Sequence, residues 1–366
     1  MGVPAPEPPE YSQQGWPLGE PELEKMIQDR WLRAGSCALS FSVRGYAPIQ
    51  FGATAIRNTL LHFAPRLRSI SLTLSSRFLS RLVDIGPFPA LETLAVANHF
   101  DTADRLEFEI LGAAPRLQKL IYRGFAGHSR LLFSCRELSV VACEGPLSPD
   151  EFFDVVLGAP SLENFTGCVR EGEGAIARLD AVTHGRLQTL HLSYGSYLSF
   201  LRLLRLPALQ NIHLATPFEA DECPVLLSFL TRSSASLRRF STSIHDIPLA
   251  TDWFSTSMPY LTDIVLYNPR RVFLGDFFRK LDRAQDKEFL PHLQNLAFRD
   301  CIVDVDAPLL EALSSRCMAD EGSFILRSFQ VWPPNVVDNL LDESQTTALR
   351  TLVERGMKIY VGKDEL

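Results

Sequence analysis

The sequence predicts an α/β solenoid in which short parallel strands alternate with helical or irregular connections. Three observations support this fold class. One phrase recurs along most of the chain, the phrase has the period of a strand, and several segments between its copies have the period of a helix. The phrase consists of a proline, one further residue and then Leu-x-x-Φ-x-Φ, where Φ is an apolar residue.

Seven copies carry the proline, and four more lack it but keep the leucine, which we call the anchor. The anchors are Leu67, Leu91, Leu117, Leu138, Leu162, Leu187, Leu209, Leu237, Leu261, Leu293 and Leu326. Their spacing runs from 21 residues (Leu117 to Leu138) to 33 (Leu293 to Leu326), and most intervals match leucine-rich repeats of roughly 20 to 29 residues. A segment at Leu39 has the pattern of one earlier unit. The two long intervals after Leu261 leave the register there less defined.

Within each copy, apolar residues alternate, which is typical of a strand with one buried face. The proline ends the preceding helix and favours an extended residue before it. Strands joined by crossover connections lie parallel. Stacked repeats then form a curved parallel sheet on the concave side, with helices on the convex side. The predicted fold is therefore an irregular leucine-rich-repeat solenoid with repeats of about 21 to 33 residues.

Four connecting segments show apolar residues at three-to-four spacing and are predicted to be helical. They cover residues 54–63, 103–112, 149–158 and 307–317. The third has a complete start signal, with Ser148 as N-cap, Pro149 at the first helical position and Glu151 at the third.

The two ends of the repeat array are predicted to be caps, because terminal repeats lack one neighbour. Residues 1–20 are rich in proline and are expected to form a flexible tail, and 21–366 a single solenoid. The N-terminal cap is a helix over 21–33 with an apolar stripe of Leu23, Met26, Ile27 and Leu32. The C-terminal cap covers 333–366, with a helix from residue 335 that stops at Gly356 and a final strand at 357–361.

Composition excludes several classes of function. The apolar content of 46% is that of a folded chain, and the net charge of −7 provides no basic field for nucleic acid. Seven dispersed cysteines without a CxxC pair indicate reduced thiols. The N-terminus has no apolar signal region, and no run of 18 apolar residues is present. We therefore expect a cytoplasmic or nuclear protein that binds neither nucleic acid nor membrane.

The phrase WLRAGSCALSFSV, which begins at Trp31, and the repeats that follow it resemble the leucine-rich-repeat portion of basidiomycete F-box-type proteins. The resemblance covers about residues 31–332. It implies that the repeats hold the substrate of a ubiquitin ligase and that an upstream F-box of about 40 to 50 residues binds the ligase adaptor. Only 30 residues precede Trp31, and they lack the Leu-Pro-x-Glu phrase, so the F-box is expected to be missing. An adaptor is a partner only if an F-box exists upstream.

Strand residues that flank the buried positions should point to the concave face, where their summed side chains form the surface that a protein partner meets. The larger members are of types common at binding hot spots. These candidate partner-binding residues are Lys119, Arg123, His191, His213, Arg239, Tyr267, Arg299 and Trp332. Solvation of an open sheet face explains any one of them equally well.

His191 and His213 occupy the same position in consecutive repeats and should lie roughly 5 Å apart on adjacent strands. A metal would need a third ligand, for which the next strand offers Ser241, with His245 farther along. Neutral surface histidines are the preferred interpretation, and neither a metal nor a cofactor is expected.

No catalytic motif was found, and the acidic loop from Glu171 to Gly174 has no phosphate-binding context. The last four residues, KDEL, spell a retention address for the endoplasmic reticulum, and Asn164 begins a glycosylation sequon inside a predicted strand. Both are interpreted as coincidental. The leading hypothesis is a non-enzymatic protein-interaction scaffold. The alternative is a lumenal repeat protein with a protein ligand, and an enzyme on a repeat scaffold ranks last.

Overall fold

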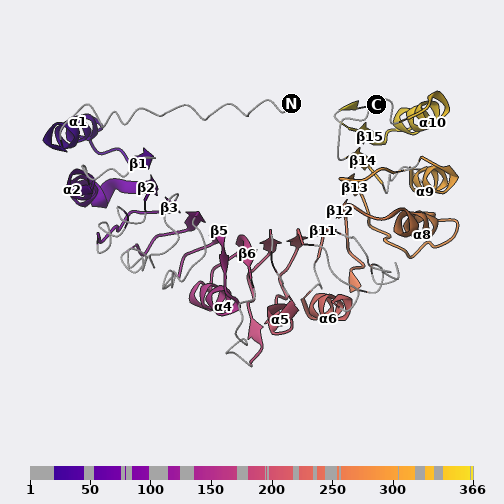
Figure 1. Cartoon of the computed structure of the whole chain (residues 1–366), viewed down its shortest axis with the longest axis horizontal. Coiled ribbons are helices and arrows are strands. Elements are labelled where there is room, and N and C mark those ends of the chain that lie inside the picture. The colour runs from indigo at the N-terminus through magenta and orange to yellow at the C-terminus, as the bar shows by residue number, and fades with distance from the viewer. Residues whose placement is uncertain are drawn as a thin grey trace, which may run out of the picture. The chain divides into compact units, whose positions relative to one another are not determined.

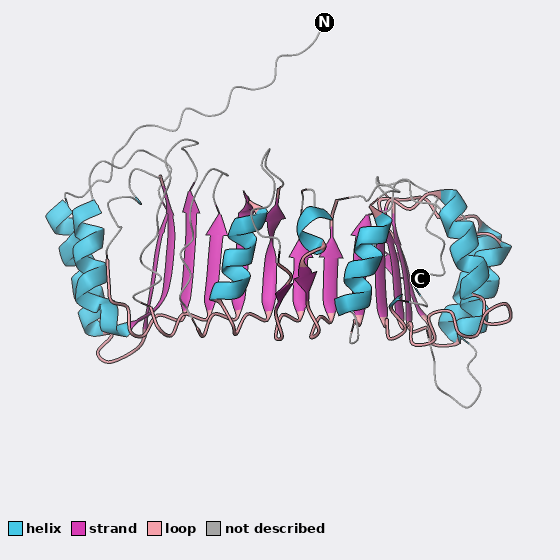
Figure 2. Cartoon of the chain, turned by 90° about the horizontal axis from the view of Figure 1, so that it is seen from below, coloured by secondary structure: helices cyan, strands magenta, loops and turns pink. Residues whose placement is uncertain are grey.

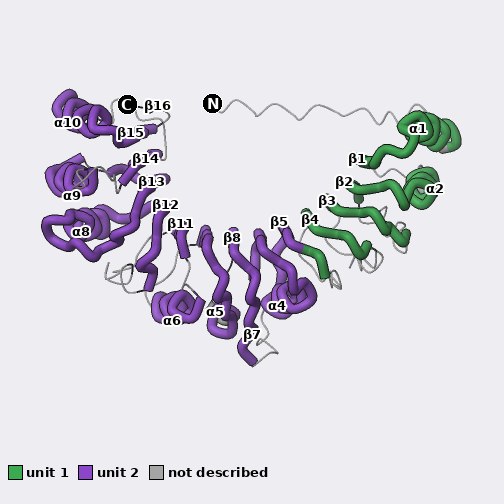
Figure 3. Tube along the Cα trace, turned by 180° about the vertical axis from the view of Figure 1, so that it is seen from behind, with its two compact units in different colours: residues 1–138 green, residues 139–366 purple. Residues whose placement is uncertain are grey.

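The computed structural model describes residues 20–44, 53–75, 79, 85–98, 114–123, 136–170, 180–193, 195, 198–216, 222–233, 237–243, 254, 257–303, 305–317, 326–333, 341–362 and 364–365. The chain divides into two compact units, Met1–Leu138 and Ser139–Leu366 (Figure 3). In the described part, no helix is long and apolar enough to cross a lipid bilayer. The predicted tail at 1–19, the helix at 103–112 and the loop from Glu171 to Gly174 lie outside the described residues.

Unit 1 is a parallel sheet with helices at its N-terminal end. Its elements are α1 (Glu20–Arg33), β1 (Leu39–Arg44), α2 (Ala53–Phe63), the 3₁₀ helix η1 (Ala64–Arg66), β2 (Leu67–Leu74), β3 (Thr93–Asn98) and β4 (Lys119–Arg123). The four strands pair in chain order, each parallel to the next, and β1 confirms the earlier repeat unit at Leu39.

Unit 2 continues the same strand-and-connection pattern. Its elements are β5 (Val140–Leu147), α4 (Pro149–Gly158), β6 (Asn164–Val169), β7 (Val182–Thr183), β8 (Thr189–Leu192), α5 (Leu198–Leu201), β9 (Leu204–Arg205), β10 (Asn211–Leu214), α6 (Cys223–Ser233), β11 (Arg239–Ser243), β12 (Asp263–Tyr267), α8 (Arg271–Leu281), β13 (Asn295–Arg299), α9 (Ala307–Cys317), β14 (Ser328–Trp332), α10 (Glu343–Glu354), β15 (Lys358–Val361) and β16 (Asp364–Glu365).

The long strands of unit 2 form one parallel sheet in the order β5, β6, β8, β10, β11, β12, β13, β14, β15. Within this unit the helices lie on the convex side of the curved sheet, and the strands stand side by side (Figures 1 and 2). Between repeats, β7 and β9 form a separate two-stranded parallel sheet. At the end of the sheet, β16 pairs with β15 in the antiparallel direction. The predicted fold class, a leucine-rich-repeat solenoid, is confirmed.

All eleven anchor leucines are completely buried, at 0% exposure, including Leu293 and Leu326 after the two long intervals. The residue after an anchor repeatedly donates its N–H to the carbonyl of the equivalent residue in the preceding repeat. Glu92 donates to Arg68 and Gln188 to Glu163, each at 2.9 Å, and Gln294 donates to Thr262 at 2.8 Å. The predicted register is therefore correct through the last repeat.

The repeated proline lies in a turn that directly precedes the anchor leucine. In the turn from Phe88 to Leu91, Pro89 is the second residue, and the Leu91 N–H closes the turn on the Phe88 carbonyl at 3.2 Å. The same bond joins Leu209 to Leu206 at 3.0 Å. Proline favours this position of a turn because its fixed φ matches the required backbone. The proline thus favours the turn that precedes the anchor in the copies that carry it.

The helix starts follow capping chemistry. Ser148 Oγ accepts from the Glu151 N–H at 3.2 Å, while the Glu151 carboxylate accepts from the Ser148 N–H at 2.8 Å, so the predicted capping box is confirmed. The helix predicted from residue 335 has its described start at Glu343. Asp342 caps it through a second capping box with Gln345, which the prediction did not include. Gly356 ends this segment at a φ of +97°, as predicted.

The N-terminal helix is confirmed, but its predicted apolar stripe is only partly buried. Met26 is 39% exposed and Leu32 is 60% exposed. Trp31 instead makes the main contact, since its ring meets Phe41 at 5.3 Å and Phe63 at 4.8 Å in edge-to-face geometry. A terminal helix has a neighbouring repeat on one side only, which explains the exposure of the remaining stripe.

Arg316 on α9 is fully buried, at 0% exposure. Its guanidinium donates to the carbonyls of Leu281 at 2.7 Å and Leu290 at 3.1 Å, and also to the carbonyl of Phe289. Burial is the main cause that lowers the pKa of Arg316 to about 10, so the side chain still carries its charge at neutral pH. Arg316 therefore ties α9 to the long loop between α8 and β13.

Candidate functional site

The sequence-predicted site residues stand on the strand faces of both units. Lys119 and Arg123 are exposed at the two ends of β4 in unit 1. The other six come from six consecutive strands of unit 2, namely His191 on β8, His213 on β10, Arg239 on β11, Tyr267 on β12, Arg299 on β13 and Trp332 on β14. The parallel register decides which of them meet.

The two histidines lie side by side, as predicted. Residues 191 and 213 are register partners, and their ring centroids are 4.1 Å apart in edge-to-face geometry. His213 Nδ1 lies 2.8 Å from the hydroxyl oxygen of Ser241, its partner on the next strand. Ser241 thus fixes one nitrogen of the His213 ring rather than serving as a metal ligand.

Burial keeps both rings neutral. The pKa of His213 is lowered to about 4, mainly by desolvation and to a smaller extent by electrostatic repulsion from His191 and Arg299. Desolvation also lowers the pKa of His191. Neutral histidines are ordinary metal ligands, but no group of three His, Cys, Asp or Glu residues that could hold a metal occurs among the described residues. His245 lies outside them.

A stacked group completes this face of the sheet. Tyr267, Arg299 and Trp332 are register partners on β12, β13 and β14. The Arg299 guanidinium carbon is 4.5 Å from the Trp332 ring centroid and 5.9 Å from that of Tyr267, so cation–π contacts hold it between two rings. Tyr267 also meets His213 edge to face at 5.7 Å. We call His191, His213, Tyr267, Arg299 and Trp332 the His–aromatic surface.

A shallow pocket of about 450 Å³ opens within this surface. It is lined by His191, Ser193, His213, Ala215, Ser243, Tyr267, Asn268 and Asp300. Asn268 and Asp300 both adopt left-handed backbone, at φ +51° and +55°. The Asn268 N–H donates to the Arg299 carbonyl and the Asp300 N–H to the Trp332 carbonyl, each at 2.8 Å. The two residues extend the ladder beyond the strand ends and form one rim of the pocket.

Sequence reasoning missed Asn268 and Asp300, although a signal was present. Each directly follows the last residue of a predicted strand, and Asn and Asp are the non-glycine residues that best tolerate left-handed backbone. Both residues lie one position beyond the alternating strand pattern, which ends at Tyr267 and Arg299, and are therefore outside the predicted strand face.

Arg239 belongs to a separate polar row. Its Nε lies 3.5 Å from a carboxylate oxygen of Asp263, and Asn295 Nδ2 donates to the other oxygen of Asp263 at 2.8 Å. The Arg239 side chain is 68% exposed, whereas that of Asp263 is 21% exposed. Arg239 is thus held by an ion pair, and its outer edge still faces solvent.

A serine hydroxyl bonded to a histidine, as Ser241 is to His213, is also found where a serine nucleophile is activated. A catalytic pair also needs a group that orients the base and donors for an oxyanion. In the described structure no carboxylate is bonded to His213. The backbone of β10 and β11 is engaged in the ladder with both neighbouring strands. The geometry therefore supports a polar contact within a face rather than a nucleophile.

Comparison with known proteins does not assign the chain to a family. No family model matches it, and no curated protein matches it. Among solved structures, the chain is similar to one titled as the crystal structure of a TLR13-ssRNA13 complex, at 12% identity and a TM-score of 0.45. The match covers 88% of this chain and 41% of that one, so the chain spans less than half the length of the structure it matches.

Proposed function

We propose that this chain is a non-enzymatic scaffold that binds a protein partner through the His–aromatic surface of unit 2. The observation that supports this most is that five side chains from five strands contact one another in a continuous series, and three of them, His191, His213 and Tyr267, line a pocket of about 450 Å³. Such a surface loses little side-chain freedom when a partner docks, because its rotamers are already restricted. Tyr, Trp and Arg are also the residue types that dominate binding hot spots.

Charge supports a protein partner over a nucleic acid. The chain carries a net charge of −7, and the His–aromatic surface contains two neutral histidines beside a single arginine. Binding to a phosphate backbone relies on several cations that displace counterions, which this surface does not offer. A polypeptide with aromatic, apolar and hydrogen-bonding side chains matches it better.

The partner can be found by affinity capture with the wild-type chain and with Trp332→Ala and Arg299→Ala. Each substitution should lower the affinity for the captured partner about tenfold or more, equivalent to about 1.4 kcal/mol of binding free energy. The thermal stability of the chain should change little. Arg279→Ala is the control, because Arg279 is also an exposed arginine but lies on the convex helix α8 beside Asp276. Arg239→Ala should weaken the same partner less.

Two results contradict the proposal. One is capture of the same partner at equal strength by the wild-type chain and both surface variants. The other is recovery of no protein partner together with turnover of a small molecule by the purified chain. Unfolding of either surface variant, measured by circular dichroism, would instead assign those residues to stability.

More specifically, we propose that the bound protein is the substrate of an F-box-type ubiquitin ligase. Support comes from the resemblance of residues 31–332 to the repeat portion of fungal F-box-type proteins. The test is the genomic sequence upstream of Met1 together with co-precipitation of the ligase adaptor by the full gene product. An in-frame Leu-Pro-rich helical module that recruits the adaptor supports this role, and full-length protein without adaptor contradicts it.

A second candidate is a lumenal repeat protein, which the C-terminal KDEL favours. Residues Asp364 and Glu365 of this address pair with Val361 and Tyr360 as part of the sheet. A receptor that reads a free tail would have to detach them. An apolar signal region upstream of Met1, and redistribution of a tagged protein when 363–366 are removed, would support the lumenal role over the cytoplasmic or nuclear one.

A further inference from the structure

The pocket within the His–aromatic surface carries a single charge on its wall. Of the eight described residues that line it, Asp300 is the one that is ionised at neutral pH, because desolvation lowers the pKa of His191 and His213 and keeps them neutral. Arg299 does not line this pocket. Its guanidinium carbon lies 4.5 Å from the ring centroid of Trp332, which is also outside the lining. We call this space of about 450 Å³ the Asp300 pocket.

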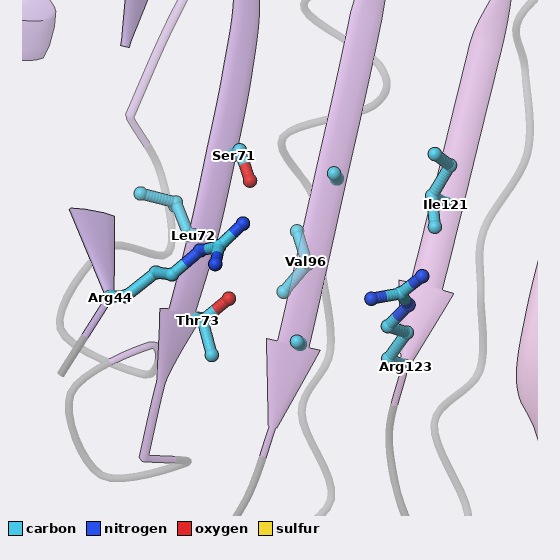
Figure 4. Close-up of a pocket in the computed structure, with 9 residues that line it drawn as sticks. Arg44, Ser71, Leu72, Thr73, Val96, Ile121 and Arg123 are labelled. Atoms are coloured by element: carbon cyan, nitrogen blue, oxygen red, sulfur yellow. The ribbon is translucent and has the colours of Figure 1, made fainter. Parts of the chain in front are cut away.

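A pocket on the strand face of unit 1 has a different lining. It has a volume of about 320 Å³, and its nine lining residues include Arg44 and Arg123 but no acidic residue. Figure 4 shows the Arg44 side chain reaching over β2 between Ser71 and Thr73, while the Arg123 guanidinium stands on β4 at the other side. A carboxylate as the one charge is therefore a property of the Asp300 pocket and is not shared by both strand-face pockets.

The carboxylate of Asp300 stands at the pocket rim on a fixed backbone. Asp300 has a φ of +55°, and its N–H donates to the Trp332 carbonyl at 2.8 Å. The residue is exposed, and no ion pair joins it to a basic side chain in the part of the chain that the structure describes. Asp263 in the polar row is different, because Arg239 already pairs with it. Asp300 thus gives the pocket a negative charge that a ligand can neutralise.

Two other lining residues add hydrogen-bond acceptors. Ser193 Oγ donates its hydrogen to the Gly167 carbonyl at 3.1 Å, which leaves the lone pairs of this oxygen as acceptors. A neutral imidazole has one nitrogen that accepts, and His191 supplies such a ring beside that of His213. The wall therefore matches a group that carries a positive charge and donates several hydrogen bonds.

We propose that the Asp300 pocket receives the charged end of a basic side chain, lysine or arginine, from the partner protein. This rests on the proposed function, namely that the His–aromatic surface binds a polypeptide. A lysine ammonium has three donors and an arginine guanidinium has five, and neither has an acceptor. Either group can pair with the Asp300 carboxylate and also donate to Ser193 or His191. A carboxylate or phosphate of the partner would instead meet a charge of its own sign.

The test uses the full untagged chain labelled with ¹³C-histidine and follows its histidine Cε1–Hε1 signals by NMR at neutral pH. The chain has eight histidines, and His191→Gln and His213→Gln identify the two signals of the pocket. The probe is the peptide Ac-Gly-Ser-Lys-Ser-Gly-amide, compared with versions that carry arginine, acetyl-lysine or glutamate in place of lysine. We expect saturable shifts of both signals with the two basic peptides, and the tighter peptide identifies the preferred side chain. Acetyl-lysine removes the charge and should bind about tenfold more weakly than lysine.

Three variants separate a specific pocket from general attraction to an acidic chain. Asp300→Asn removes the charge but keeps a residue that tolerates left-handed backbone, and it should weaken binding of the lysine peptide about tenfold. Asp276→Asn is the control, because Asp276 is an exposed aspartate on α8 outside the pocket, and it should leave the affinity unchanged. Ala215→Leu keeps the charge of Asp300 but fills part of the pocket, so it should weaken binding about fivefold. Thermal unfolding of each variant checks that the fold is intact.

The proposal is overturned by equal binding of the acetyl-lysine peptide, by no saturable shift with either basic peptide, or by equal loss of affinity in Asp276→Asn and Asp300→Asn. Tighter binding of the glutamate peptide would assign the pocket to an anion instead. Failure here with continued capture of a partner through Trp332 would leave the proposed function standing. Binding of the basic peptides without any captured protein would refute the proposed function, while the pocket would keep its preference for cations.

Discussion

The strand faces of the two units have the same parallel backbone arrangement but carry different kinds of side chains. In unit 2, neighbouring strands place interacting side chains in register, so His213 meets Ser241, Arg239 meets Asp263, and Arg299 lies between Tyr267 and Trp332. In unit 1, small residues such as Ala95 and Ala97 occupy the middle of the face, and exposed charged residues such as Arg44, Lys119 and Arg123 lie at the strand ends.

The buried interiors of the two units differ in the same way as their strand faces, because unit 2 contains more polar side chains. Among the described residues, unit 1 buries one polar side chain, Thr59, whereas unit 2 buries seven, including His184, Asp282 and Arg316. The large fully buried side chains of unit 2 are mostly phenylalanines, such as Phe152 and Phe277. The comparison teaches that unit 2 is specified by particular polar and aromatic contacts, while unit 1 depends mainly on apolar burial.

Arg316 is the strongest test of that difference. Replacing it with Met keeps much of its volume but leaves the carbonyls of Leu281, Phe289 and Leu290 without their donor. We expect a loss of about 3 to 5 kcal/mol in the free energy of unfolding, measured by urea denaturation. The exposed control Arg279→Met should change it by less than about 0.5 kcal/mol. A loss for Arg316→Met below about 1 kcal/mol would refute a specific polar interior in unit 2.

Matched leucine truncations compare the apolar contribution to each unit. Leu94 in β3 and Leu190 in β8 occupy equivalent positions and are 2% and 0% exposed. Replacing either with Ala should cost about 2 to 5 kcal/mol. Limited proteolysis should then show early cleavage confined to the unit that carries the substitution. Cleavage that spreads equally over both units would indicate that they unfold together and would weaken the distinction between them.

Acid should affect unit 2 through His213. Its pKa is about 4 in the folded chain and about 6.5 when unfolded, so between these values the unfolded state binds a proton that the folded state does not. The contribution of neutral His213 to the free energy of unfolding is therefore fully present above pH 6.5 and is lost as the pH falls toward 4. After discounting for partial exposure, we expect His213→Gln to remove about 1 to 2 kcal/mol of this loss. Parallel pH profiles for the variant and the wild type would contradict this.

Thr59 provides the smallest and opposite effect. Its hydroxyl oxygen is buried on α2 and has no hydrogen-bond partner among the described residues. Replacing it with valine keeps the shape and removes an unsatisfied polar atom, so unfolding free energy should stay equal or rise by up to about 1 kcal/mol. A loss greater than about 1 kcal/mol would show that unit 1 also relies on a specific buried polar contact.

The sequence was sufficient for the repeat register because each anchor leucine has a local and periodic signature. All eleven are buried, and the contact between His191 and His213 follows directly from that register. Contacts within one row of strands are predictable for the same reason. The pairing of Arg239 with Asp263 also lies within one row, but the alternation of apolar residues carries no information on whether neighbouring strands have complementary charges.

The remaining features depend on contacts that have no local signature. Arg316 follows a helix pattern and resembles a solvent-facing residue, because the carbonyls that bind it come from residues 26 to 35 positions away. On the convex side, the strand pair β7 and β9 takes the place of a helix. Each strand has only two residues, which is too short to show a periodic pattern in the sequence. The strand that begins at Leu39 ends at Arg44, one residue beyond the last apolar residue of its alternation, Val43, so the apolar pattern contains no signal for Arg44.

The reversed direction of β16 has a consequence for association between molecules. A parallel stack of strands ends in a row of unpaired N–H and C=O groups, which can recruit a strand from another chain. In this protein β16 covers the outer edge of β15 at Tyr360 and Val361, and it places two acidic residues, Asp364 and Glu365, there. Because β16 already occupies the outer edge of β15 at Tyr360 and Val361, a strand from a second copy cannot pair there, and edge-to-edge association at these two residues is disfavoured.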